Sequence, residues 1–164
     1  MQHKVTSVIS EIGMFVIGFE NGTICEYQHV SGLKTHSRTF KSHTGPVTTL
    51  YVTGSRMASM CTQKMCVWCT ATGMYIFETV SMSGFVAMVP QTGNCLWLVD
   101  QCGDGCRAVL WDIFEQIPLH SVTLDIDSST STFIATSLDT VAVISNGQQA
   151  VVWDIGGTDQ IAVF

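Results

Sequence analysis

The 164-residue sequence is poor in charge, since only 12% of its residues are Asp, Glu, Lys or Arg, about half the share of an average soluble domain. It has only 3 prolines, and its longest apolar runs, such as 14–19 and 141–144, are far too short to cross a membrane. The 7 basic residues form no cluster that could neutralise phosphates, so direct binding to nucleic acid is not expected. The first ten residues lack the cationic and apolar regions of a signal peptide, which predicts an intracellular, cytoplasmic protein.

The residues that the sequence does have in abundance favour short buried strands. Of all residues, 46% are hydrophobic, and there are 18 valines and 19 threonines. β-branched residues are enriched in strands, so we expect an all-β fold. The 7 cysteines are scattered along the chain, and in a cytosolic compartment they are expected to be reduced thiols.

A repeat is visible in the aromatic residues that end four short apolar segments. These aromatic anchors are Tyr27, Trp68, Trp111 and Trp153, and they lie 41, 43 and 42 residues apart. A period of about 40–45 residues with several strands per unit is typical of β-propeller blades. We therefore predict four antiparallel strands in each of four blades, with bounds near 1–41, 42–82, 83–127 and 128–164.

Motifs around the anchors resemble those of the WD-repeat (WD40) family. Trp111-Asp112 and Trp153-Asp154 are the dipeptide that names the family. The segment 42–50, with His43 and Gly45, is similar to the family's Gly-His region before an innermost strand, which is expected at 47–52, and Asn21-Gly22 is similar to its tight turn. The resemblance covers essentially the whole chain. It implies an all-β fold, a β-propeller of four WD40-like blades, as part of a larger ring, because such rings usually close with seven or eight blades.

The resemblance also implies structural roles for particular residues. In the family, a histidine, a serine or threonine, an aspartate and the tryptophan form a hydrogen-bonded set within a blade. His43, Ser59 and Trp68 are expected to supply three members, whereas Thr62 or Gln63 takes the place of the aspartate. The remaining residues expected to hold the blades together are Tyr27, Trp111, Asp112, Trp153 and Asp154.

Two motifs that suggest other chemistry are weaker. Gly103-x-Gly105-x-x-Ala108 follows an apolar strand, as in a dinucleotide-binding fingerprint. That fingerprint needs a helix beginning at Gly105, whereas the repeat predicts a strand at 107–113, so a nucleotide-binding enzyme is the least favoured function. Cys66 and Cys69 have a zinc-like spacing, but residues three apart on a strand face opposite ways. We therefore predict no metal, no cofactor and no catalytic residues.

The predicted function is that of a non-catalytic protein–protein interaction scaffold. The turns before each third strand would lie on one rim of the propeller, which makes Asn21, Gln63, Asp104 and Asn146 the candidate contact residues. Expected partners are proteins of a multi-subunit complex, or further blades supplied in cis or in trans. The chain would then be a fragment, half of a paired ring, or an unusual four-bladed ring. The alternative function is a reader that binds a peptide or a small polar ligand near the propeller axis.

Overall fold

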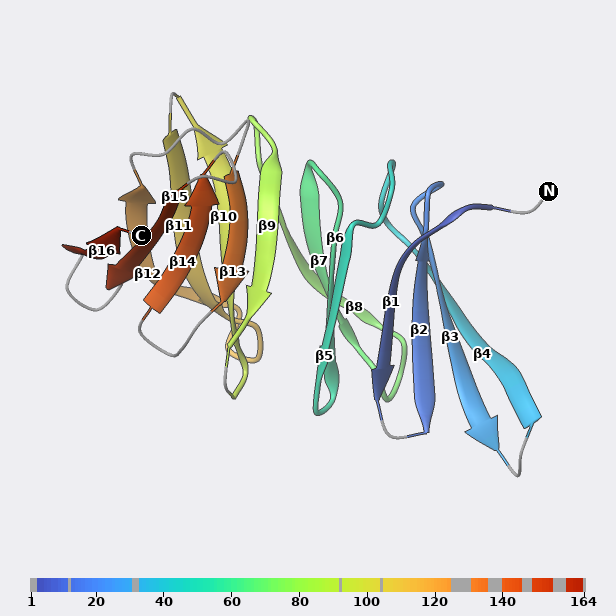
Figure 1. Ribbon diagram of the computed structural model, residues 1–164. Helices are drawn as coiled ribbons and strands as arrows, with labels where there is room; N and C mark the ends of the chain where they lie inside the picture. The colour runs from blue at the N-terminus through green and yellow to red at the C-terminus, as the bar shows by residue number, and fades with distance from the viewer. Residues whose placement is uncertain are drawn as a thin grey trace. The chain divides into compact units, whose positions relative to one another are not determined.

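The computed structural model describes residues 3–11, 13–30, 33–91, 93–103, 105–124, 131–135, 140–145, 149–154 and 159–163. Side chains are described for 3–11, 13–28, 35–91, 93–103 and 105–123. The described residues contain sixteen strands in four sheets, and no helix occurs among them. The chain divides into two compact units, 1–82 and 83–164, each with two sheets (Figure 1).

The first unit begins with a sheet in the order β1-β2-β3-β4. Its strands are β1 (Val5–Glu11), β2 (Met14–Phe19), β3 (Thr23–Val30) and β4 (Leu33–Lys41). The second sheet has the order β5-β6-β7-β8. Its strands are β5 (Thr49–Thr53), β6 (Arg56–Met60), β7 (Lys64–Cys69) and β8 (Tyr75–Val80). Each sheet is therefore an antiparallel meander in which neighbours in sequence are neighbours in space.

The second unit repeats the same plan. Its third sheet consists of β9 (Phe85–Pro90), β10 (Cys95–Cys102), β11 (Gly105–Asp112) and β12 (Ile117–Leu124). Its fourth sheet consists of β13 (Ser131–Ala135), β14 (Thr140–Ser145), β15 (Gln149–Asp154) and β16 (Asp159–Val163). Both are again antiparallel and run in sequence order. Among the described residues, no helix is long and apolar enough to cross a lipid bilayer.

Every aromatic anchor lies at the same structural position in its sheet. The pairing between the third and fourth strands shifts register immediately before the anchor in all four sheets, between Glu26 and Tyr27, Val67 and Trp68, Leu110 and Trp111, and Val152 and Trp153. An irregularity of this kind adds a residue to one strand and increases the local twist. The period seen in the sequence is therefore a period of the backbone as well as of the side chains.

One predicted strand was wrong at its start, because Val47 makes its contacts with the preceding sheet. We expected the strand to begin at Val47, whereas β5 begins at Thr49. The amide of Val47 donates to the carbonyl of Phe19 at 3.2 Å. The carbonyl of Val47 accepts hydrogen bonds from Thr6 Oγ1 and Ser7 Oγ, both at 2.8 Å. Val47 thus joins the first sheet to the second before β5 begins.

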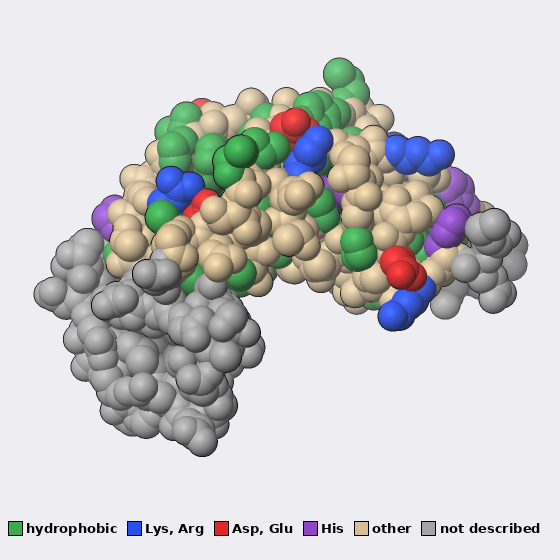
Figure 2. Space-filling view, turned by 90° about the horizontal axis from the view of Figure 1, so that it is seen from above, with side chains coloured by type: hydrophobic (Ala, Val, Ile, Leu, Met, Phe, Trp, Pro, Cys, Tyr) green, Lys and Arg blue, Asp and Glu red, His purple; other side chains and the backbone are tan. Residues whose placement is uncertain are grey.

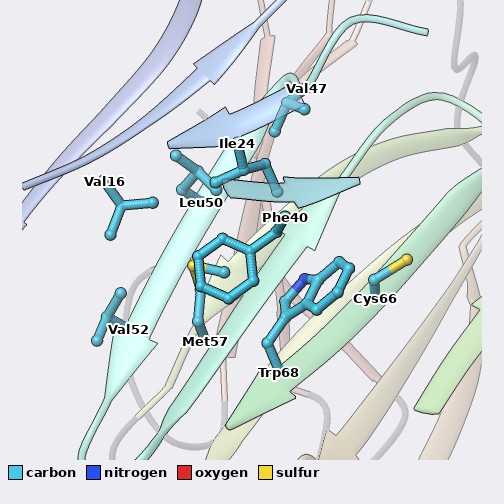
Figure 3. Close-up of a cluster of buried hydrophobic side chains, with 9 residues drawn as sticks. All are labelled: Val16, Ile24, Phe40, Val47, Leu50, Val52, Met57, Cys66 and Trp68. Atoms are coloured by element: carbon cyan, nitrogen blue, oxygen red, sulfur yellow. The ribbon is translucent and has the colours of Figure 1, made fainter. Parts of the chain in front are cut away.

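The two sheets of the first unit share one hydrophobic core (Figure 3). It consists of Val16, Ile24, Phe40, Val47, Leu50, Val52, Met57, Cys66 and Trp68. The rings of Phe40 and Trp68 meet edge to face, with centroids 5.2 Å apart. Outside this core, the Arg38 guanidinium on β4 donates to the carbonyls of Thr70 and Ala71 in the turn between β7 and β8. Apolar burial and cross-sheet hydrogen bonds therefore act together in this unit.

The third sheet has a core of its own, made of Val89, Trp97, Val99, Cys106, Ala108 and Val122. Trp97 is 1% exposed, so the tryptophan that the repeat leaves unassigned is also a core residue. Beside this core, the buried carboxylate of Asp100 pairs with Arg107 at 2.7 Å. Charged side chains are few on the face shown in Figure 2, where they lie scattered among hydrophobic and uncharged polar groups.

Candidate binding site at one end of the second sheet

The candidate site is built on a buried chain of three side chains in the second sheet. Ser59 lies on β6, Trp68 on the neighbouring β7, and His43 in the segment that precedes β5. Trp68 Nε1 donates to Ser59 Oγ at 2.9 Å, and Ser59 Oγ lies 2.8 Å from His43 Nε2. The structure therefore brings together three of the four positions that the WD-repeat resemblance implied.

A small pocket lies directly beside this chain of hydrogen bonds. The pocket, here called the rim pocket, has a volume of about 190 Å³ and is lined by Thr44, Gly45, Pro46, Cys61, Thr62 and Gln63. Three lining residues follow His43 in sequence, and the other three form the turn between β6 and β7. The backbones of Cys61 and Lys64 close that turn with hydrogen bonds of 2.9 and 3.3 Å. A tight hairpin thus holds Thr62 and Gln63, which are exposed.

The turn that contains Asn21 packs against the same segment. Asn21 Oδ1 accepts a hydrogen bond from the Thr23 amide at 3.1 Å, which fixes the turn. A Cβ at Gly22 would lie 2.2 Å from the His43 carbonyl oxygen, so only glycine permits this approach. Asn21 and Gln63, both predicted as rim residues, belong to turns that adjoin residues 43–46. Asp104 lies outside the described residues, as does Asn146, so their contact role stays a prediction.

The electrostatics of the site keep His43 neutral. Burial, with a smaller contribution from the charge of Lys64, lowers the pKa of His43 to about 4. Lys64 forms an ion pair with Glu78 of β8 at 2.8 Å, and the hydrogen bond with Lys64 lowers the pKa of Glu78. Near neutral pH the imidazole therefore carries no charge, and the nearby ammonium group is already paired.

Of the other predicted anchors, Tyr27 lies within β3, whereas the two Trp-Asp dipeptides end β11 and β15. Tyr27 meets His36 edge to face at 5.5 Å, and Trp111 is half-buried on β11. Asp112 accepts hydrogen bonds from the amides of Phe114 and Glu115 at 2.8 and 2.9 Å, so it caps the turn after β11. The backbone positions of Trp153 and Asp154 on β15 match those of Trp111 and Asp112 on β11; their side chains lie outside the described residues.

The glycine motif that suggested nucleotide binding lies in a hairpin. Gly105 begins strand β11, and it pairs with Cys102 of β10. The helix that a dinucleotide fingerprint requires is therefore replaced by a strand at this position. Cys66 is buried and Cys69 is only half-buried, and the expectation that their side chains face opposite ways stays a prediction. Within the described residues, no group of three or more His, Cys, Asp or Glu side chains is arranged to hold a metal ion.

Sequence reasoning identified Gln63 but missed most of the rim pocket. The lining of Thr44, Gly45 and Pro46 depends on a loop between two sheets, and the sequence predicted this segment only as the region before an innermost strand. The ion pair of Lys64 with Glu78 was also missed. These residues are 14 positions apart, and they meet because the register places Cys66 opposite Glu78.

Comparison with solved structures identifies the fold. The RRP9 WD40 repeats superpose with a TM-score of 0.78 at 14% identity, over 100% of this chain and 52% of theirs. The Neurospora crassa Pan2 WD40 domain gives a TM-score of 0.74 at 9% identity, over 99% of this chain and 50% of that domain. The fold is that of a WD40 β-propeller. The predicted fold class is thus confirmed, and each four-stranded sheet corresponds to a WD40-type blade.

The WD40 likeness is one of structure and not of sequence. No protein-family model matches the chain, and no curated protein matches its sequence. The computationally designed Ika4 protein gives a TM-score of 0.75 at 21% identity, over 95% of this chain and 94% of its own. The chain therefore spans about half the length of the RRP9 and Pan2 WD40 structures, and nearly all of a designed chain with the same fold.

Proposed function

We propose that this chain is a non-catalytic platform for protein–protein interaction, and that the rim pocket of the second blade contacts the partner. The observation that carries the proposal is the convergence of the Asn21 and Gln63 turns on segment 43–46, next to a pocket of about 190 Å³. Solvent-accessible turns on a rigid scaffold are where binding residues concentrate. The WD40 fold supports the proposal in general terms, although fold alone does not fix function.

The chemistry of the pocket also favours binding over catalysis. His43 directly precedes the lining residue Thr44, and its pKa of about 4 leaves it a poor base near neutral pH. Burial raises the pKa of the neighbouring Cys66 thiol to about 11, which makes it a poor nucleophile. Groups held in these protonation states suit a structural role behind a binding surface.

A pair of arginine variants tests the proposal. Thr62 and Ser55 are both exposed, and they lie in the turns at opposite ends of β6. The full chain, tagged and expressed in its native cells, is purified as wild type, Thr62→Arg and Ser55→Arg. We expect a stoichiometric partner protein to be lost only from Thr62→Arg, because the long side chain fills the rim pocket. Equal retention by both variants, or no stoichiometric partner at all, would overturn the proposal.

We also propose that further blades complete the ring, in cis or in trans. The support is that the chain covers only 52% and 50% of the RRP9 and Pan2 WD40 structures. A blade buries its apolar faces against its neighbours, so an incomplete array exposes a terminal face. Sedimentation of the chain at low micromolar concentration should show it in an assembly larger than its 17.9 kDa mass. A stable 17.9 kDa monomer that resists proteolysis would contradict this proposal.

A further inference from the structure

One face of the first sheet is apolar and accessible to a partner. Val16 on β2 belongs to the core that the first sheet shares with the second (Figure 3). Side chains alternate between the two faces of a sheet, so Phe15 and Ile17 lie on the other face. Phe15 is opposite Tyr27 in the register, and residues opposite one another share a face. Ile17 is likewise opposite Val8. These four residues, here called the open face, are half-buried except for Val8, which is 60% exposed.

The corresponding face of the second sheet is covered. Trp68, the anchor that corresponds to Tyr27, is 4% exposed. Leu50 and Val8 correspond to one another, because each lies in the row two residues before its anchor. Leu50 is 7% exposed, and both Leu50 and Trp68 pack in the core shared with the first sheet. A face of this kind is thus buried by the opposite face of a neighbouring blade, and the open face has the same apolar chemistry.

The fourth sheet carries an apolar row at the position that such a contact needs. The row consists of Ile134, Ala142, Val152 and Ala162, which lie opposite one another in the register. Val152 directly precedes the anchor Trp153, so the row belongs to the face opposite the anchor. In the first sheet, the face opposite the anchor is the one that covers the second sheet. The chain itself therefore contains a face that matches the open face.

Charge is divided unevenly between the two units. Residues 1–82 contain six basic and four acidic residues, a net charge of +2, whereas residues 83–164 contain one basic and nine acidic residues, a net charge of -8. Two fourth sheets would repel one another, since 128–164 contains three aspartates and no basic residue. The first sheet carries exposed Lys4 and Lys41. Complementary charge therefore favours contact of a first sheet with the fourth sheet of another molecule.

We propose that a second copy of this chain docks its fourth sheet on the open face, and that two such contacts close a ring of eight blades. The inference rests on the proposal that further blades complete the ring, and it names their source. The chain spans 52% and 50% of the RRP9 and Pan2 WD40 structures, so two copies together match the length of one such structure. A head-to-tail contact that is repeated in both copies closes the ring.

Two aspartate variants test the proposal by sedimentation of the full chain at low micromolar concentration. Val8 on the open face and Val80 on β8 are both 60% exposed, so an aspartate at either position stays in contact with water in the single chain. We expect the wild type and Val80→Asp to sediment at twice the 17.9 kDa mass of the chain. Val8→Asp should sediment as the monomer, because the contact would bury an unpaired carboxylate. A monomeric wild type, or equal masses for the two variants, would overturn the proposal.

Mixing two defective variants tests the head-to-tail pairing. Ala142→Asp adds a carboxylate to the apolar row of the fourth sheet and should also give a monomer. A pair formed from Val8→Asp and Ala142→Asp has one contact with both substitutions and one contact with neither. The mixture should therefore recover a species of twice the mass, which would also show that both variants are folded. A mixture that stays monomeric at every concentration, or a dimeric Ala142→Asp, would contradict head-to-tail pairing and overturn the proposal.

This proposal and the proposed function fail in different ways. If the chain is found in an assembly with a different protein and not with a second copy, further blades complete the ring and only the second copy is wrong. If the chain sediments at twice its mass but Thr62→Arg keeps every partner, the second copy is correct and the role of the rim pocket is wrong.

Discussion

The substitution Ser59→Ala tests the hydrogen-bonded core of the second blade. Ser59 is 0% exposed, and its Oγ is the shared partner of Trp68 Nε1 at 2.9 Å and His43 Nε2 at 2.8 Å. Alanine fits the same space, so the change removes one oxygen without creating a steric clash. It leaves Trp68 Nε1 and His43 Nε2 without the hydrogen-bond partner that they share.

The expected cost follows from those two groups. Leaving a buried polar group unsatisfied costs about 1–3 kcal/mol, so the loss of both partners predicts about 2–6 kcal/mol. Ser7→Ala is the matched control. It also removes one serine hydrogen bond, to the Val47 carbonyl, but that carbonyl keeps its bond from Thr6 Oγ1. We therefore expect the control to cost less than about 1 kcal/mol.

Hydrogen exchange of the β6 and β7 amides, followed by NMR, measures the free energy of opening of this sheet in each variant. Ser59→Ala should lower it by at least about 1 kcal/mol more than Ser7→Ala does. In a Trp68→Phe background the indole donor is already absent, so Ser59→Ala should cost about 1–3 kcal/mol less than in the wild type. A cost within about 0.5 kcal/mol of zero in the wild-type background would refute the argument that Ser59 satisfies both groups.

Three further predictions concern other properties of the chain. Burial lowers the pKa of His43 from 6.5 to about 4, so as the pH falls the unfolded chain binds the proton before the folded chain does. The free energy of unfolding, measured in urea, should therefore fall by about 3 kcal/mol between pH 6.5 and 4. The variant His43→Gln should lack this loss. The hydrogen bond with Thr72 lowers the pKa of Cys69. Iodoacetamide at pH 8 should therefore alkylate Cys69 at least tenfold faster than buried Cys66, as measured by mass spectrometry of the peptides. Equal rates would contradict the assigned burial. Trp68→Ala should cost about 3–5 kcal/mol, whereas Trp111→Ala should cost less because Trp111 is only half-buried; urea unfolding with equal losses would show that exposure does not set the cost.

The repeat made the fold predictable from the sequence. A backbone irregularity recurs in each sheet at the aromatic anchors Tyr27, Trp68, Trp111 and Trp153. Their spacing therefore predicts four repeated sheets even where the bounds of single strands are not known. The end of a strand was harder to predict. Valine is common in strands, but the amide and carbonyl of Val47 form hydrogen bonds with the first sheet. No local sequence pattern indicates a contact with residues so distant in sequence.

The candidate site was predictable only in part, for a related reason. The resemblance placed His43, Ser59 and Trp68 together because it carries information about contacts between strands. The rim pocket depends on how one turn and one loop approach each other in space. Among the described residues His43 Nδ1 has no hydrogen-bond partner, and this too depends on everything that surrounds the ring, so neither composition nor spacing could predict it.

The register shift at each aromatic anchor has a consequence for how such a chain tolerates change. A strand that slips by one residue sends every side chain to the opposite face, yet here each blade resets its pairing at its own tyrosine or tryptophan. Each sheet also pairs only its own four strands, so an insertion in a loop between sheets leaves the register within the next sheet unchanged. Blades of this kind can diverge, lengthen their loops or be duplicated one at a time, so sequence identity can be lost while the architecture persists.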